Sequence, residues 1–134
     1  MRPLLRSVFH KGMLALSGGT LLALTACAGQ TNPGQDPRGL WVGALVTDKG
    51  VCPTDRNSTL QVNAHEILFT PADGSLVLRG VRGPNNLHFH AQLETTDQDH
   101  KPRPMVFDGY PVGQAIGGTF GTPSCRAHVT MTRS

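Results

Sequence analysis

The chain has 134 residues and a formal net charge of +3 at pH 7. Arg2, Arg6 and Lys11 account for this excess, because residues 27–134 contain nine Lys and Arg residues against nine Asp and Glu residues. A segment so close to neutrality lacks the basic surface that nucleic-acid binding needs, so we exclude a nucleic-acid partner. The 108 residues from position 27 onward are enough for one domain with one hydrophobic core.

Residues 1–26 have the layout of a secretory signal peptide. The three basic residues precede Met13–Ala26 (MLALSGGTLLALTA), an uncharged and mostly apolar run of 14 residues. A membrane-spanning helix needs roughly 18 to 20 apolar residues, so this run is too short to cross a bilayer. It is typical of the apolar core of a signal peptide.

The run ends in Leu24-Thr25-Ala26-Cys27, which resembles the lipobox of bacterial lipoproteins. The resemblance implies that Cys27 is alkylated with diacylglycerol, that the chain is cut before it, and that its acyl chains, palmitate among them, anchor the protein to a membrane. By analogy with Gram-negative sorting, Ala28 in place of Asp favours the outer membrane over the inner, and we expect an anchor on its periplasmic face. The alternative is an ordinary secretory signal followed by an incidental cysteine.

Lipidation of Cys27 would leave Cys52 and Cys125 as an even pair in an oxidising compartment, and we predict a disulfide between them. On the chain-entropy model, closing a loop of about 74 residues stabilises the fold by about 4 kcal/mol. The bridge would tie the loop after the first strand to the start of the last strand. Two free thiols or a metal-binding pair are the alternatives.

Residues 27–38 are predicted to be the lipidated cysteine followed by a flexible tether. The stretch Ala28–Arg38 (AGQTNPGQDPR) has no apolar periodicity and is rich in Gly, Pro and Gln. Eleven flexible residues span an r.m.s. distance of roughly 18 Å. The folded domain is then expected to occupy residues 39–134.

From Gly39 onward, short runs of two-residue alternation are separated by Gly, Pro, Asn and Asp clusters, which is typical of an all-β antiparallel barrel or sandwich. We predict about eight strands, at residues 39–47, 59–63, 66–70, 75–80, 87–95, 105–110, 115–121 and 125–132. The strands at 87–95 and 125–132 both alternate between apolar and polar residues, and the second should turn Cys125 toward the interior. The polar stretch at residues 97–104 is predicted to be an exposed loop.

Three glycine-containing sequences predict local geometry. Residues 71–74 (PADG) and 83–86 (GPNN) are predicted to be turns, with Gly74 accepting a positive φ in the first. Gly117-Gly118 interrupts an apolar run and indicates a bulge or a sharp bend.

His88 and His90 lie two apart on one predicted strand, so both imidazoles should project from the same face. A zinc or copper ion would need further donors, for which the sequence offers the following residues: His65, Asp97, Asp99, His100 and His128. Because nothing selects one of them, we favour solvated surface histidines and expect no metal and no other cofactor.

No catalytic residues are predicted, and we expect that the protein is not an enzyme. The chain contains no Gly-x-Ser-x-Gly, His-Glu-x-x-His or Ser-x-x-Lys motif and no glycine-rich phosphate loop before a helix. Paired carboxylates would be needed for glycosidase-like work, but no spacing selects a pair among Glu66, Glu94 and Asp108. Asp108 is expected to bond to the backbone of its own turn.

Gly39-x-Trp41 at the head of the first strand resembles the Gly-x-Trp of lipocalins. The chain is also similar to small lipoprotein protease inhibitors of the bacterial envelope, which have an eight-stranded barrel, one disulfide, an early Trp and a last strand ending in Arg, as Arg133 does here. Their bridge closes a shorter early segment. The resemblance implies an eight-stranded barrel, whereas the single Trp disfavours the biotin-binding barrels.

These observations predict a lipid-anchored β-barrel binding module of the bacterial envelope, which engages a small ligand or a protein partner through the barrel mouth or through loops 48–58 and 97–104. The candidate ligand-lining residues are Trp41, Phe69, Phe89 and Phe120. A structural or assembly accessory of the envelope and a protease inhibitor are the alternatives. A cavity lined by these aromatic residues would favour a small ligand, and a filled interior would favour a protein partner.

Overall fold

The structure is a computed structural model that describes residues 32–134, so the predicted signal peptide and Cys27 lie outside the described residues. These residues form an all-β fold with nine strands, a result that confirms the predicted class. The strands are β1 (Gly39–Ala44), β2 (Val46–Gly50), β3 (Asn57–Val62), β4 (Glu66–Thr70), β5 (Leu78–Val81), β6 (Phe89–Thr96), β7 (Pro102–Val112), β8 (Ala115–Thr122) and β9 (Cys125–Arg133). Within the described range, no helix is long and apolar enough to cross a bilayer.

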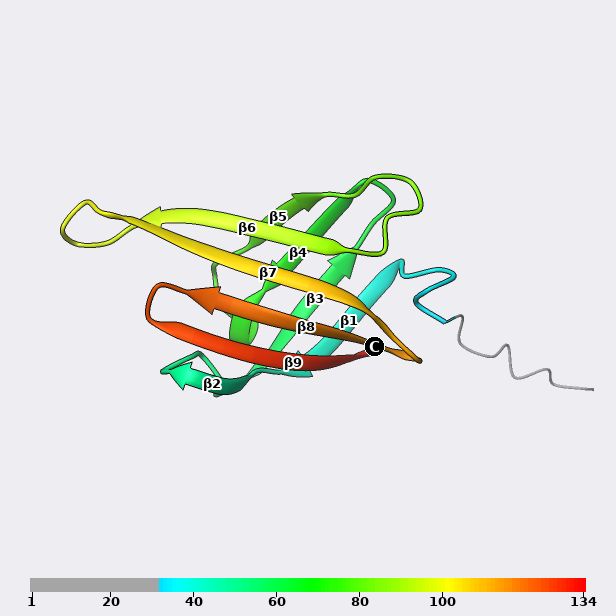
Figure 1. Ribbon diagram of the computed structural model, residues 1–134, viewed down its shortest axis with the longest axis horizontal. Helices are drawn as coiled ribbons and strands as arrows, with labels where there is room; N and C mark the ends of the chain where they lie inside the picture. The colour runs from blue at the N-terminus through cyan, green and yellow to red at the C-terminus, as the bar shows by residue number, and fades with distance from the viewer. Residues whose placement is uncertain (1–31) are drawn as a thin grey trace, which may run out of the picture.

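The sheet closes on itself as an eight-stranded antiparallel barrel (Figure 1). The neighbours run in the order β1, β3, β4, β5, β6, β7, β8 and β9, and the pairs Trp41↔Arg133 and Val42↔Thr132 join β9 back to β1. Strand β2 is the ninth. It follows β1 after the buried Leu45 and pairs with the first half of β9. The predicted first strand, residues 39–47, is therefore two strands.

The other predicted strands are present with shifted ends. Strand β5 begins at Leu78, three residues later than predicted, and β7 begins at Pro102, three residues earlier than predicted. The predicted exposed loop at 97–104 is therefore shorter, because its last residues pair with β6. The resulting β6–β7 hairpin extends beyond the body of the barrel (Figure 1).

Alternating side chains fill the barrel interior. In β9 the buried residues Cys125, Ala127, Val129 and Met131 alternate with exposed ones, as predicted. Phe69 and Phe107 stack with ring centroids 4.1 Å apart, and Phe120 packs 5.8 Å from Phe69. An eight-stranded barrel is just wide enough for side chains to occupy its interior, and here the aromatic rings do so.

The bulge predicted at Gly117-Gly118 is absent, because β8 keeps an unbroken register with both neighbours. The glycine at 118 instead makes room for a ring: a Cβ there would lie 2.7 Å from Cε2 of Phe107. Gly109 pairs with Gly118, and a Cβ at Gly109 would lie 2.9 Å from Cζ of the same Phe107 ring. A register shift does occur, but in β2, between Thr47 and Lys49.

The turn at residues 71–74 is present with a different distribution of backbone angles. Ala72 and Asp73 have positive φ values of 50° and 52°, whereas Gly74, which we expected to have a positive φ, has a φ of −86°. The buried Ser58 holds this turn, because its Oγ accepts a hydrogen bond from the Ala72 N–H at 2.9 Å. The predicted turn at 83–86 also forms, with Asn85 at a φ of 61°.

One end of the barrel, which we call the plugged end, is closed by Trp41 and Arg133. The Arg133 guanidinium lies 4.4 Å from the centre of the fully buried Trp41 ring. Arg133 also donates hydrogen bonds to the carbonyl oxygens of Arg38 at 2.5 Å and Asp36 at 2.9 Å. Trp41 Nε1 donates to the Pro37 carbonyl at 2.8 Å.

Residues 32–38 therefore dock against the plugged end, although we predicted a flexible tether as far as Arg38. A turn from Asn32 buries Pro33, and Pro37 is also buried. The Asp36 side chain accepts two hydrogen bonds from the Arg38 guanidinium. In these contacts, backbone carbonyls and the Asp36 side chain of the segment form hydrogen bonds within the protein, whereas in a free tether they would bind water.

The opposite end, which we call the open end, carries the predicted disulfide between Cys52 and Cys125. Gly50 pairs with Cys125 at the end of the β2–β9 ladder, so the bridge joins segments that are already neighbours in space but 73 residues apart in sequence. It ties the loop after β2 to the start of β9, as predicted. The C-terminus lies at the other end, where the Ser134 N–H donates to the Leu40 carbonyl.

Two junctions in the barrel have few aligned pairs, β9–β1 with two and β5–β6 with one. Strands β5 and β6 share one aligned pair, Arg79↔Gln92, whereas β6 and β7 share eight. At Gly80 the two backbones come so close that a Cβ would collide with the His90 carbonyl oxygen. Only glycine fits at that position.

Candidate functional site

The four residues predicted to line a ligand cavity belong to the packed core. Trp41, Phe69 and Phe89 are fully buried and line neither of the two pockets described below, while Phe120 borders both. The structure brings Phe69 and Phe120 into contact and places Trp41 beneath Arg133. The interior is thus filled, so the binding surfaces to consider are at the barrel end and on its outer face.

The first candidate is a depression of about 310 Å³ at the open end, which we call the open-end pocket. Its lining is mostly apolar and comes from the loop after β2, the turn after β4 and the first part of β7. The lining residues are Val51, Pro53, Pro71, Ala72, Gly74, Ser75, Leu76, Arg103, Met105, Phe120, Thr122 and Cys125. Its volume lies at the lower limit of the roughly 300–1,000 Å³ usual for ligand sites.

The open-end pocket combines apolar walls with one cation. Val51 is 90% exposed and Leu76 is 40% exposed, so apolar groups face solvent here. The Arg103 guanidinium is positioned by a 3.2 Å hydrogen bond from Nη2 to Ser124 Oγ. Such a pocket suits an apolar group that carries a negative charge. The predicted loops 48–58 and 97–104 do contribute to it, through Val51, Pro53 and Arg103.

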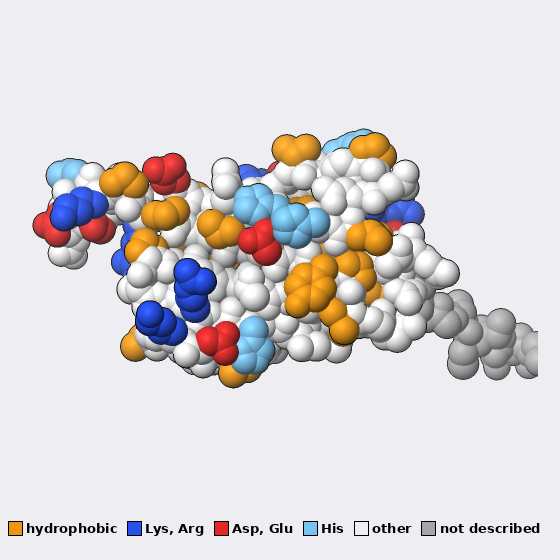
Figure 2. Space-filling view, viewed as in Figure 1, with side chains coloured by type: hydrophobic (Ala, Val, Ile, Leu, Met, Phe, Trp, Pro, Cys, Tyr) orange, Lys and Arg blue, Asp and Glu red, His pale blue; other side chains and the backbone are white. Residues whose placement is uncertain are grey.

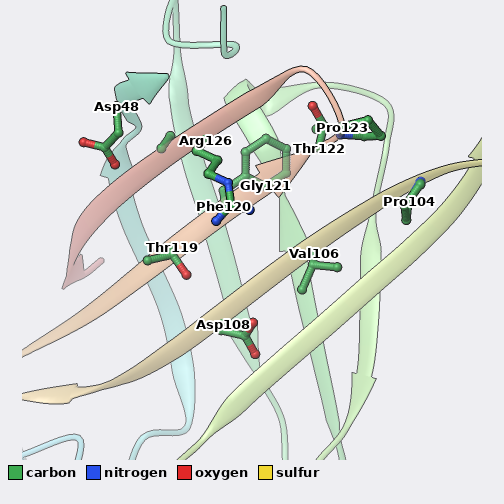
Figure 3. A pocket seen from close by; sticks show the side chains of 11 residues that line it. Asp48, Pro104, Val106, Asp108, Thr119, Phe120, Gly121, Thr122, Pro123 and Arg126 are labelled. Atoms are coloured by element: carbon green, nitrogen blue, oxygen red, sulfur yellow. The ribbon is translucent and has the colours of Figure 1, made fainter. Parts of the chain in front are cut away.

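The second candidate is a groove of about 540 Å³ on the outer face of the barrel, over β7, β8 and β9 (Figure 3). It exists because Gly121, in the middle strand, has no side chain between its partners Val106 and Arg126. The Arg126 side chain extends over Gly121, and Asp48, Thr119 and Asp108 border the groove.

Beside this groove, His88, His90 and Asp108 form a cluster on the outer face, which we call the His–Asp cluster. His88 Nε2 donates to Asp108 Oδ1 at 2.9 Å, and His90 Nδ1 donates to the same oxygen at 2.6 Å. Their possible metal-ligating atoms all lie within 4.8 Å of one another. Figure 2 shows histidine side chains against acidic ones on this face of the molecule.

The Asp108 carboxylate stabilises the protonated form of His90. The hydrogen bond to the Asp108 carboxylate raises the pKa of His90, against an opposing effect of partial burial, and a bond to Gln92 adds to the increase. His90 Nε2 lies 3.3 Å from Gln92 Oε1, so both nitrogens of this ring face oxygen acceptors. A second pair, His128 Nδ1 and Asp48 Oδ1 at 2.7 Å, lies on β9 and β2.

Asp108 is the residue whose role we predicted wrongly. It lies within β7 opposite His90 and bonds to two histidines, not to the backbone of a turn. The further donors that we considered are elsewhere: His128 pairs with Asp48, and Asp97 accepts bonds from the backbone of the β6–β7 turn. Within residues 32–134, the cluster is the one group of three possible ligands that the geometry brings together.

The carboxylates considered for catalysis have separate environments. Glu66 on β4 pairs with Arg79 on β5 at 3.0 Å, and Glu94 lies exposed on β6 opposite Pro104. Asp108 is bound to its two histidines.

Comparison with protein-family models, with curated proteins and with solved structures gave no significant match for this chain.

Proposed function

We propose that the protein is a lipid-anchored binding module of the bacterial envelope that captures small apolar anions in the open-end pocket. The main support for this proposal is the position of the pocket. It lies at one end of the barrel, and residue 32, the first residue that the structure describes, lies at the other. An anchor at Cys27 would leave the pocket directed away from the membrane and accessible to solutes.

The filled interior, which we expected to favour a protein partner, rules out a ligand inside the barrel and leaves its open end as the place for a small ligand. Because Trp41, Phe69, Phe89 and Phe107 occupy the core, a ligand has no space inside the barrel without displacing packed rings. Displacing a close-packed aromatic side chain costs several kcal/mol, which would be subtracted from the binding free energy of the ligand. The exposed apolar groups at the open end require no such displacement.

An envelope accessory that binds a protein partner is the second candidate, and one exposed patch favours it. Tyr110 and Val112 are each 53% exposed and both lie over Gly117, where a Cβ would be 3.1 Å from Val112 Cγ2 and 3.5 Å from Tyr110 Cε2. This apolar patch is on the outer face near the plugged end, away from the open-end pocket.

A fluorescent apolar sulfonate, 1-anilinonaphthalene-8-sulfonate, tests the two candidates. We expect its fluorescence to rise with the wild-type protein and the rise to be lost with Leu76→Asp, which places a negative charge in the pocket wall. Val81→Asp is the matched control, because Val81 is 87% exposed and lies outside the pocket. A signal that persists in Leu76→Asp and disappears in Tyr110→Asp would contradict the pocket and favour the partner surface.

The lipid anchor is tested separately. We expect Cys27→Ser to leave an unprocessed and unlipidated precursor, because the thiol is the proposed site of alkylation. Labelled palmitate should enter the wild-type protein and not the variant. Mass spectrometry of the wild-type protein should show a mature N-terminus at Cys27. Incorporation of label into Cys27→Ser, or a mature N-terminus at another residue, would refute this part of the proposal.

A further inference from the structure

We infer that His88, His90 and Asp108 form a binding site for a divalent transition metal ion, Zn²⁺ or Cu²⁺. Two imidazole nitrogens and one carboxylate oxygen lie within 4.8 Å of one another on adjacent elements of the outer face. Imidazole ligands suit zinc and copper, whereas calcium and magnesium prefer sites made of oxygen atoms. The inference goes beyond the proposed ligand function and uses different residues.

The backbone holds the three donors in place. His90 and Asp108 are direct cross-strand partners in β6 and β7, so their side chains project from the same face of the sheet. His88 precedes β6, and its N–H donates to Asn86 Oδ1 at 2.9 Å, which fixes the chain between the Asn85 turn and the strand. The site is thus supported by a strand pair and by a capped turn.

The hydrogen bonds of His90 indicate where a metal would bind. Gln92 Oε1 is an acceptor, so it keeps a proton on His90 Nε2. A neutral His90 ring then has its lone pair on Nδ1, the atom that faces Asp108 Oδ1 at 2.6 Å. A metal ion bound to Nδ1 would take the place of the hydrogen that lies between Nδ1 and Asp108 Oδ1, while Gln92 continues to orient the ring.

Charge and access also favour a metal. The Asp108 carboxylate forms no ion pair with a Lys or Arg side chain within residues 32–134. The His88, His90 and Asp108 side chains are 61%, 44% and 38% exposed, so an ion can reach them without a change in the barrel. Three protein donors would leave at least one coordination position for water or for a donor from another molecule.

Titration calorimetry of the full chain with ZnCl₂ tests the site. We expect one Zn²⁺ per chain at the cluster. His90→Gln should weaken this binding by at least about 100-fold, because losing a ligand costs more than losing the outer partner of a ligand. Asp108→Asn should weaken it as well. His128→Gln is the matched control, because His128 is also bound to an aspartate on the outer face but has no third donor.

Electron paramagnetic resonance with Cu²⁺ gives a second measurement. The spectrum of the wild-type protein should show hyperfine coupling of the copper to two nitrogen atoms, and the spectrum of His90→Gln should show coupling to one. Trp41 fluorescence should be identical in all variants, because the altered side chains are exposed and Trp41 is buried. No Zn²⁺ binding by the wild-type chain, or equal losses in His90→Gln and His128→Gln, would overturn the inference.

Discussion

At the plugged end, the Arg133 side chain stacks on the Trp41 ring and donates hydrogen bonds to the carbonyl oxygens of residues 36 and 38. The polar and aromatic side chains at this end are therefore packed against other parts of the chain. At the open end, the Cys52–Cys125 bridge holds the loop after β2, and apolar side chains such as Val51 stay exposed. The plugged end depends on non-covalent contacts of the docked N-terminal segment, and the open end depends on a covalent link. This difference allows the open end to expose apolar side chains without losing its shape.

The largest effect is expected from breaking the covalent link. Replacing both Cys52 and Cys125 with Ser should lower the free energy of unfolding by about 4 kcal/mol, because the unfolded chain regains the freedom of a long loop. Urea denaturation followed by Trp41 fluorescence measures the change. A thiol reductant should destabilise the wild-type protein and leave the double variant unchanged. An equal urea midpoint for reduced and oxidised wild-type protein would contradict the prediction.

A smaller effect is expected from the plugged end. Arg133→Ala should lower the free energy of unfolding by about 2 kcal/mol, since it removes the stacking on Trp41 and two hydrogen bonds from a charged group. Arg126→Ala is the matched control on the same strand, because the Arg126 side chain forms no hydrogen bond or ion pair within residues 32–134. The same urea experiment applies. An equal decrease in the free energy of unfolding in Arg133→Ala and Arg126→Ala would contradict a stabilising role of the Arg133 contacts.

The smallest effect concerns pH. Hydrogen bonds from Arg38 lower the pKa of Asp36 from its ordinary value of 3.8 to about 2. The ionised carboxylate is therefore favoured in the folded state, so its contribution is complete above pH 3.8 and is lost as the pH falls toward 2.

Asp36→Asn should remove this part of the acid sensitivity, and Arg38→Gln should remove the same part. The exposed position of the pair keeps the effect small. Melting temperatures of the three proteins at pH 5 and pH 2 measure it. A wild-type protein that loses no more stability than Asp36→Asn between these values would contradict the assignment.

The sequence predicts most strands because one face of each is buried and the other is exposed. In β9 the alternation from Cys125 to Met131 is complete, and the prediction for that strand is correct to one residue. Barrel closure has no such local signal, because it depends on Trp41 meeting Arg133 from the far end of the chain. The break at Leu45 was missed because residues 40–46 (LWVGALV) form a run without a polar side chain, which gives no sign of an interruption.

Asp108 was not considered as the third member of the His–Asp cluster because it was expected to bond to the backbone of its own turn, and because the predicted loop bounds imply a different register. In the structure, the β6–β7 hairpin is centred on Asp99, which places His90 opposite Asp108. The predicted loop at 97–104 is centred between residues 100 and 101, and that centre would have placed His90 opposite Pro111. A two-strand register is sensitive to the exact position of its turn, so an error of one to two residues separated the donors.

The single aligned pair between β5 and β6 has a consequence for slow fluctuations of the barrel. The disulfide joins the loop after β2 to β9, and Arg133 joins β9 to residues 36–38, so neither link crosses this junction. Transient separation should start there, and the backbone amides that face it should exchange hydrogen for deuterium sooner than those between β7 and β8. The barrel would then open as one curved ribbon, with strands β6 to β9 still attached to β1.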